Sequence, residues 1–404
     1  MSENVDIDIW LGIDVGKTHH WATAIDSDGE IVHSRTLPND EEKLRQIYSK
    51  LEDKGCVLVV VDQAATIGAL AVSVAQAMGI MVAYLPGLSM RRIADLHPGN
   101  AKTDKKDAFI IAEAARTMPH TLRALRNLDE CEAELRMLTG FDEDLARQIT
   151  QTRNRIRGLY TQIHPALEQF IGKHLDHPAV LALLQAWPTP EALKKAGRTR
   201  IAAKLKKHGA RCFNDWANKI MEALGKQTVT VIGTGAAQTV IPHLASTLQE
   251  FYRQRADMTR KIEDLVAGHP LYPVLASMPG NGVRTSAIII AEIAGKEFPN
   301  AAALSSYAGL TPKTRQSGTS IRSATASHTG NKRLKRALHL SAFASIKSDP
   351  TSRIYYDKKR TEKKCHKQAL TSLAHKRTTV LYAMLRDGTL YQPQHKPQQL
   401  KKAA

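Results

Sequence analysis

Cysteine is scarce in this 404-residue chain, and no two cysteines stand close together in the sequence. The four of them, Cys56, Cys131, Cys212 and Cys365, include no C-x-x-C pair. Zinc modules and disulfide frameworks need such closely spaced or numerous cysteines. We therefore expect a reducing compartment, with neither structural zinc nor a disulfide scaffold.

Long apolar runs are missing as well. The first ten residues, MSENVDIDIW, have neither the basic start nor the apolar run of a signal peptide. No stretch approaches the roughly 18 consecutive apolar residues that a transmembrane helix requires. Hydrophobic residues nevertheless make up 43% of the chain, enough for packed cores. We expect a cytoplasmic protein of two or three domains that has no membrane partner.

Acidic residues are outnumbered. Asp and Glu total 39 against 57 Lys and Arg, which gives a formal net charge of +18. An excess of this size favours a polyanionic partner, above all a nucleic acid, because phosphates neutralise such charge. A basic surface that serves only solubility is the alternative that composition leaves open.

Residues 8–120 predict an α/β domain. The runs IWLGIDVG and CVLVVVD are typical of buried strands. HWATAID and EIVHSRTL, joined by the turn Ser27-Asp28-Gly29, extend the first strand into an antiparallel meander. A helix is predicted to follow the cap at Asn39 or Asp40, and another in TIGALAVSVAQAMG. The order strand-strand-strand-helix-strand-helix-strand-helix is that of the ribonuclease-H-like layered fold.

Strand patterns stop near residue 125, and the remainder predicts an all-α protein. Apolar residues at three- and four-residue spacing predict two long amphipathic helices, over 135–170 and 244–265, typical of a coiled coil. Each has a polar residue in its seam, Asp142 and Arg255. The helices are expected to pair with each other or with another protomer. Between them, 177–240 is a helical insert rich in Lys and Arg, whose role the sequence does not determine.

The C-terminal region begins near Leu271. LASMPGNGVRTSAIIIAEIAG predicts two helices around a tight turn, a helix-hairpin-helix-like element in which Gly280 and Gly282 present backbone N–H groups to a phosphate. An ordinary αα-hairpin is the alternative. A basic helix follows, and the tail is expected to be disordered. The expected divisions are an N-terminal domain (1–124), a helical coiled-coil linker (125–268), a C-terminal domain (269–391) and a tail (392–404).

Four acids stand out in the first region. Asp14 lies in a predicted strand, Asp62 ends another, and Asp104 and Asp107 share one helix face. An ionised carboxylate inside a strand is costly to bury unless it binds a cation. Together the four carboxylates suit two Mg²⁺ ions of the kind used in phosphoryl transfer. In the purely structural alternative, Asp104 and Asp107 stabilise the N-terminus of a helix that Thr103 caps, and Asp62 is an acid at the end of a strand.

The segment GIDVGKT also invites an ATP-binding interpretation. The Walker pattern needs four residues between its first Gly and the Gly-Lys pair, whereas Gly12 and Gly16 are separated by three. A phosphate hairpin of the actin-like or sugar-kinase type would need a second acidic loop in a duplicated domain. The second half of the chain is helical and basic instead, which argues against an ATPase.

Hydroxyl and cationic side chains cluster in TPKTRQSGTSIRSATASHTGNKRLKR. We expect Ser317, beside Gly318, to lie in a loop there, and its hydroxyl is a candidate nucleophile for a phosphodiester once a base or metal activates it. A phosphate-binding loop with no covalent role is the alternative, and Ser320, Ser323 and Ser327 compete locally. Nearby His328, like His19 and His20, is predicted to be structural or phosphate-facing. The cations expected to bind nucleic acid are Lys17, Lys102, Lys105, Arg284, Lys313, Arg315, Arg322, Lys332, Arg333 and Arg336.

These residues resemble a known family. GIDVGKTHHWATAID, VVVDQ and AKTDKKDA are similar to the N-terminal RuvC-like domain of the DEDD transposases of insertion-sequence family one-ten. The stretch from LASMPGNG to NKRLKRAL resembles the C-terminal transposase domain of that family. The two matches cover roughly 8–120 and 270–390, in the family's order. The resemblance implies a metal-binding tetrad of Asp14, Asp62, Asp104 and Asp107, although the family commonly has Glu at the second position.

The resemblance also implies Ser317 as the nucleophile, with a covalent phosphoserine bond to DNA. It implies guidance by a noncoding bridge RNA that pairs with donor and target DNA, so that the protein itself recognises mainly shape and backbone. Coiled coils would join protomers into dimers or tetramers, with active sites shared between chains. A RuvC-like junction nuclease that uses metal-bound water is one alternative, and a non-catalytic nucleic-acid-binding protein is another.

Overall fold

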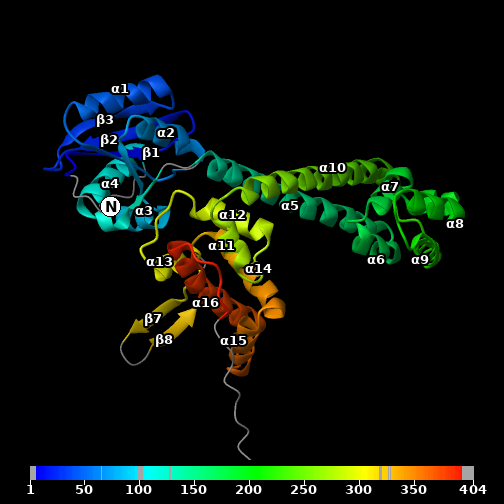
Figure 1. Ribbon diagram of the computed structural model, residues 1–404. Coiled ribbons are helices and arrows are strands. Elements are labelled where there is room, and N and C mark those ends of the chain that lie inside the picture. The colour runs from blue at the N-terminus through cyan, green and yellow to red at the C-terminus, as the bar shows by residue number, and fades with distance from the viewer. Residues whose placement is uncertain are drawn as a thin grey trace, which may run out of the picture. The chain divides into compact units, whose positions relative to one another are not determined.

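The computed structural model describes residues 6–64, 66–97, 103–126, 129–317, 321–325, 327 and 329–393, without the side chains of 314–317 and 321–324. The chain divides into two compact units, shown with their elements in Figure 1. The first unit consists of Met1–Glu130 together with Ile293–Tyr307, and the second of Cys131–Glu292 with Ala308–Ala404.

A mixed six-stranded sheet of order β3-β2-β1-β4-β5-β6 organises the first unit. The antiparallel meander β1-β2-β3 forms as expected, and β4 and β5 join it in parallel to β1. The short strand β6 closes the other edge in antiparallel orientation. The strands are β1 (Ile9–Asp14), β2 (His19–Ile25), β3 (Ile31–Pro38), β4 (Val57–Val61), β5 (Met81–Tyr84) and β6 (Arg123–Ala124).

Helices cover both faces of this sheet. Val57, Val59 and Val61 of β4 point into one apolar core, with α1 and α2, whereas Leu58 and Val60 point into the other, with α3 and α4. This alternation follows from the two-residue period of a strand, and it explains why CVLVVVD is apolar throughout. The helices are α1 (Glu41–Glu52), α2 (Ala69–Ala77), α3 (Gly87–Ala94) and α4 (Asp104–Thr117), with 3₁₀ turns η1 (Thr66–Gly68) and η2 (Pro119–Thr121). The strand order and layering confirm the ribonuclease-H-like fold.

A segment distant in sequence completes the first unit. An antiparallel bridge joins Leu125 to Lys296, and α13 (Ala301–Tyr307) follows. Residues 293–307 thus belong by packing to the α/β unit, although the C-terminal helices flank them in the sequence.

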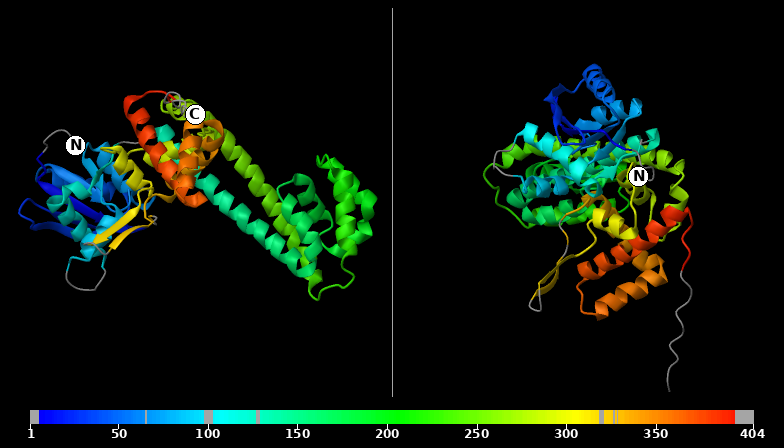
Figure 2. Two further views of the ribbon diagram at one scale, coloured as in Figure 1. Left: turned by 90° about the horizontal axis from the view of Figure 1, so that it is seen from below. Right: turned by 90° about the vertical axis from the view of Figure 1, so that its left-hand side faces the viewer.

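The second unit is almost entirely helical, as the sequence predicts. Two 34-residue helices, α5 and α10, lie side by side in both views (Figures 1 and 2). They pair with each other, and the polar seam residues meet: Arg255 Nε donates to Asp142 Oδ1 at 2.9 Å. The helices of this unit are α5 (Glu130–Ile163), α6 (Pro165–His174), α7 (Pro178–Ala186), α8 (Pro190–Lys207), α9 (Phe213–Gly225), α10 (Thr234–Ala267), α11 (Tyr272–Ser277), α12 (Val283–Ile293), α14 (Lys332–Ser348), α15 (Pro350–Thr361) and α16 (His366–Asp387).

The turn between α11 and α12 packs against α14. A Cβ at Gly280 would lie 2.7 Å from the backbone nitrogen of Ser345, so only glycine permits this approach. Arg377 of α16, largely buried, donates to the Pro279 carbonyl and to Ser341 Oγ, which fixes the turn to the C-terminal helices. Of the expected tail, residues 394–404 lie outside the described part of the chain.

The serine segment is not the plain loop that the sequence predicts. Lys313–Ser317 and Ile321–Thr325 form an antiparallel hairpin, β7 and β8, in which Ser317 pairs with Ile321. The two strands consist mainly of polar residues, so no alternation of apolar and polar positions distinguishes them from a loop in the sequence. No helix in the described part of the chain has both the length and the apolarity needed to cross a membrane.

Candidate active site

The four predicted acids come from three elements of the first unit. Asp14 is the last residue of β1, and Asp62 directly follows β4. The two strands are parallel neighbours, with Ile13 opposite Val61, so their carboxyl ends coincide at one edge of the sheet. Strand order alone therefore brings Asp14 and Asp62 together, although 47 positions separate them along the chain.

Helix α4 brings the other two acids to the same edge. Thr103 caps the helix by accepting from the Lys106 N–H at 3.2 Å, and Asp104 and Asp107 occupy the first turn. The helix backbone packs directly on β1, because a Cβ at Gly12 would lie 2.5 Å from the Ala112 nitrogen and closer still to the Ala108 carbonyl. The lack of a side chain at Gly12 therefore determines how closely the first turn of α4 approaches Asp14.

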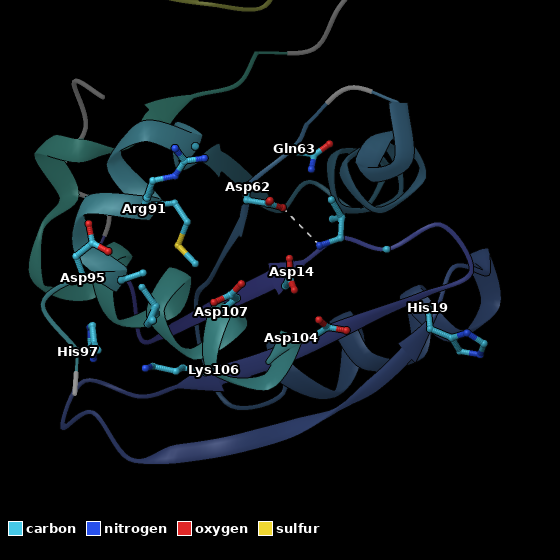
Figure 3. Close-up of a pocket in the computed structure, with 16 residues that line it drawn as sticks. Asp14, His19, Asp62, Gln63, Arg91, Asp95, His97, Asp104, Lys106 and Asp107 are labelled. Carbon is cyan, nitrogen blue, oxygen red and sulfur yellow. Dashed lines mark hydrogen bonds between the residues drawn. The ribbon is translucent and has the colours of Figure 1, made fainter. Parts of the chain in front are cut away.

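All four carboxylates line one cavity of about 820 Å³. Figure 3 shows Asp14, Asp62, Asp104 and Asp107 grouped around its centre. Thr103 caps α4, as the helix-cap interpretation predicts. That interpretation does not explain why the carboxylates of Asp104 and Asp107 lie beside two strand-end acids. The structure brings the whole predicted tetrad together.

Asp62 is partly buried at the cavity edge. Burial raises the pKa of this carboxyl above its ordinary value, while the Val15 N–H, 3.5 Å from Oδ1, opposes the shift. Asp62, Asp104 and Asp107 form no salt bridge with any residue that the structure describes. Clustered carboxylates repel one another and therefore favour a bound cation. An all-oxygen donor set of this kind fits Mg²⁺ or Mn²⁺ and not a thiolate-preferring metal.

Several cavity residues were not predicted from the sequence. Arg91 of α3, the C-cap Asp95 of that helix and His97 beyond it line the same cavity as the tetrad, and so does Lys106 of α4 (Figure 3). A basic residue beside a carboxylate cluster provides a contact for a phosphate oxygen. In the sequence, the spacing of residues in the segment MRRIAD does not mark it as part of a site. These cavity residues are therefore recognised only from the fold.

His20 and His19 differ sharply, although both were predicted to be structural or phosphate-facing. His20 is buried, and its Nδ1 accepts the Gly16 N–H at 3.1 Å, which fixes the β1–β2 turn beside Asp14. Burial is the main cause that lowers the pKa of His20. His19 is exposed and lines the cavity. His328 lies outside the described residues.

The serine candidates lie on and beside the hairpin of the second unit. Ser317 is the last residue of β7 and Ser323 lies in β8, while Gly318 and Ser320 are outside the described residues. Ser327 follows the hairpin, and its hydroxyl hydrogen-bonds to Thr329 Oγ1 at 2.9 Å. Ser327 is therefore already engaged locally.

The predicted nucleic-acid-binding cations fall into three groups. Lys17, Lys105, Lys313 and Lys332 are exposed. Arg333, Arg336 and Arg284 lie in ion pairs: Arg333 bridges Glu143 and Glu292 at 2.7 and 2.6 Å, Arg336 reaches Glu143 at 2.8 Å, and Arg284 lies 3.9 Å from Asp142. Arg315 and Arg322 belong to the hairpin strands, and Lys102 lies outside the described residues. Gly282 is exposed at the start of α12, unlike the packed Gly280.

Comparison with known proteins identifies the family. Residues 11–165 match the sequence profile of the DEDD transposases of IS110, and residues 272–357 match that of the IS116/IS110/IS902 transposase family. The 43.6 kDa protein of insertion element IS110 from Streptomyces coelicolor is 52% identical over 97% of both chains. The chain belongs to the IS110 family of transposases.

A second relative agrees with this assignment. The 42 kDa protein of insertion element IS900 from Mycobacterium paratuberculosis is 37% identical, over 95% of this chain and 97% of its own. Among solved structures, Thermus thermophilus RuvC in complex with a Holliday junction substrate matches 29% of this chain and 99% of its own length, at 18% identity and a TM-score of 0.20. As a member of the IS110 family, the protein is a transposase, an enzyme that cuts and recombines DNA.

Proposed function

We propose that this transposase cleaves and exchanges DNA strands by means of divalent cations held by Asp14, Asp62, Asp104 and Asp107. The observation that carries the proposal is the convergence of these four carboxylates on one cavity from β1, β4 and α4. Carboxylates that lie this close together repel one another, and a bound divalent cation would relieve that repulsion.

Mg²⁺ is the proposed cofactor, with two ions per site. Bound there, it would neutralise charge on the phosphate during strand transfer. The residues of the chain act around it in distinct ways. The sheet edge holds Asp14 and Asp62, and the capped helix α4 holds Asp104 and Asp107. Asp62 lines the cavity although its side chain is one methylene shorter than that of Glu.

Ser317 is the proposed nucleophile of the same reaction. Its Oγ forms a bond to a DNA phosphorus while one sugar-oxygen bond to that phosphorus breaks, and the freed sugar oxygen takes up the proton that the serine loses. The phosphoserine bond conserves the energy of the phosphodiester, so a hydroxyl of another strand can rejoin it without a high-energy cofactor. The location of Ser317 at the end of a cationic hairpin supports this role.

Sequence choice is proposed to rest on a bridge RNA that pairs with donor and target DNA, in a cytoplasmic assembly of two to four protomers. The net charge of +18, with few recognisable base-reading motifs, supports delegation of specificity to pairing. The RNA and the assembly are predictions from the family resemblance.

A denaturing gel tests the reaction class. The protein is incubated with Mg²⁺, donor and target DNA and the noncoding RNA of its element, and nucleotide-bearing protein is measured. Wild type and Ser327→Ala should form the covalent adduct, whereas Ser317→Ala and Asp14→Ala should form none. Strand cutting that persists in Ser317→Ala without an adduct would replace the serine mechanism with hydrolysis by water, as in a junction nuclease. Normal recombination by both Ser317→Ala and Asp14→Ala would refute the proposal.

A further inference from the structure

The helices α6 to α9 form an ordered module with its own apolar core. Ile156, Tyr160 and Ile163 at the end of α5 pack with residues of α6–α9, and Ile241, Ala245 and Leu248 of α10 close the cluster. Figure 1 shows these helices gathered at one end of the α5–α10 pair. The basic insert of the sequence is therefore a folded surface and not a charged linker.

Positive charge on this module is concentrated and uncompensated. Residues 194–211 contain eight Lys and Arg and no Asp or Glu. None of these eight cations forms a salt bridge with a described residue. By contrast, Lys219 and Lys226 of neighbouring α9 pair with Asp215 and Glu222 at 2.7 and 2.9 Å. Two other surface cations of this module thus pair with acids, whereas none of the eight in 194–211 does so among the described residues.

The polar contacts of these cations are neutral ones. Arg198 Nε donates to Asn218 Oδ1 at 2.6 Å, and Lys194 Nζ donates to the Gln227 carbonyl at 3.1 Å. Lys206 Nζ lies 5.5 Å from the centre of the Phe213 ring. Such contacts orient the side chains and leave their charges intact.

Helix geometry places the charges on the outer side of α8. Ile201, Ala202 and Leu205 are buried in the core of the module. On the other side Arg200 and Lys207 are exposed two turns apart, and Arg211 continues the surface into the α8–α9 turn. Mutual repulsion of like charges this close is relieved by a polyanion with regularly spaced charges.

The aromatic residues of the module indicate how such a polyanion would be recognised. Between residues 165 and 225 no Phe, Tyr or Trp is exposed, and Trp216 is packed edge-on against Phe170, His174 and His177. Single-stranded nucleic acids are usually held by exposed aromatic rings that stack on bases. A surface of cations without such rings favours contact with the phosphate backbone of a duplex.

We propose that residues 194–211, here termed the α8 basic surface, bind the phosphate backbone of a nucleic-acid duplex, at a site separate from the carboxylate cavity. The same backbone chemistry is offered by DNA and by helical segments of RNA. The site binds without reading sequence, and it therefore positions a nucleic acid and does not select it.

Full-length protein in EDTA tests the proposal by fluorescence anisotropy against salt. The probes are a DNA duplex of about 30 base pairs with unrelated sequence and an RNA hairpin of similar charge. Lys195→Gln/Lys207→Gln/Arg211→Gln removes three exposed cations that have no polar partner among the described residues. Arg157→Gln/Lys219→Gln/Lys226→Gln removes the same charge from acid-paired positions.

The first triple variant should weaken binding of at least one probe by about tenfold or more, and lower the slope of log affinity against log salt by about 2 to 3. The control should stay within about twofold of wild type, and Lys195→Arg/Lys207→Arg/Arg211→Lys should bind as wild type. The probe that loses affinity identifies DNA, RNA or both. Equal losses in the two neutralised variants, or no loss in either, would overturn the proposal.

Discussion

Gly12 of β1 lies directly against the backbone of Ala108 of α4, with no room for a side chain between them. This approach places the first turn of α4, with Asp104 and Asp107, over the strand end that carries Asp14. The site geometry thus depends on a residue that has no functional group.

Gly12→Ala should destabilise the protein and impair the site together. The added methyl would meet the Ala108 carbonyl and the Ala112 nitrogen, both of them backbone atoms that cannot rotate away. Overpacking of this kind costs about 1–3 kcal/mol. Urea unfolding and strand-cleavage assays measure the two effects. Gly158→Ala, at an exposed position in the C-terminal part of α5 with open space around it, is the control and should be neutral or stabilising by up to about 1 kcal/mol.

Stability should depend on pH through His20. Because burial lowers its pKa, the unfolded chain takes up a proton before the folded protein does as the pH falls below about 6.5. The free energy of unfolding should therefore be unaffected by His20 above that pH and decrease below it, by at most about 1.4 kcal/mol per pH unit.

His20→Gln keeps an acceptor for the Gly16 N–H without a titrating ring. Its urea midpoint should fall less than that of wild type between pH 7.5 and 5.5. Identical pH dependence in wild type and His20→Gln would show that His20 does not contribute.

Arg333 and Lys332 are adjacent in sequence and should respond differently to substitution. Arg333 bridges Glu143 of α5 and the buried Glu292 of α12, so Arg333→Ala removes one ion pair from each carboxylate and should cost about 1–3 kcal/mol. Lys332 is exposed, and Lys332→Ala should weaken DNA binding with little change in stability. Thermal unfolding and anisotropy distinguish the two. Equal stability of the variants would argue against a structural role of Arg333.

The Asp142–Arg255 pair should hold the register of α5 and α10. Asp142→Ala or Arg255→Ala should each lower the free energy of unfolding by about 1–2 kcal/mol, since Asp142 is only 15% exposed and Arg255 about one third. The reversed pair, Asp142→Arg/Arg255→Asp, should recover part of the loss. A double variant less stable than the sum of both single losses would exclude pairing as their cause.

Local patterns predicted more of the fold than of the site. The continuous apolar run CVLVVVD and the apolar seam of α5 indicate burial directly, so the layered sheet and the helix pair could be predicted from them. The local sequence does not show which residue pairs with a charged seam residue. Asp142 and Arg255 could each be identified as polar seam residues, but their ion pair could not be predicted. Likewise Asp14 and Asp62 stood out because they interrupt apolar strands, whereas Arg91 and His97 join the cavity only through the packing of α3.

The serine hairpin shows a second limit. Its strands are short and mostly polar, so no alternation of apolar and polar residues marks them in the sequence. The pairing of β7 with β8 depends on backbone hydrogen bonds, which carry little information about residue type. The return of residues 293–307 to the α/β unit likewise involves backbone contacts, such as the bridge between Leu125 and Lys296, that no side-chain pattern marks.

The central claim is that the four carboxylates form a divalent-cation site, and Mn²⁺ binding followed by electron paramagnetic resonance tests it most directly. Wild type and Asp53→Asn, an exposed acid beyond α1, should bind Mn²⁺ alike, and Mg²⁺ should compete. Asp14→Asn and Asp107→Asn should each lower the affinity by at least tenfold while the proteins remain folded. Unchanged Mn²⁺ binding in both of these variants would contradict the account.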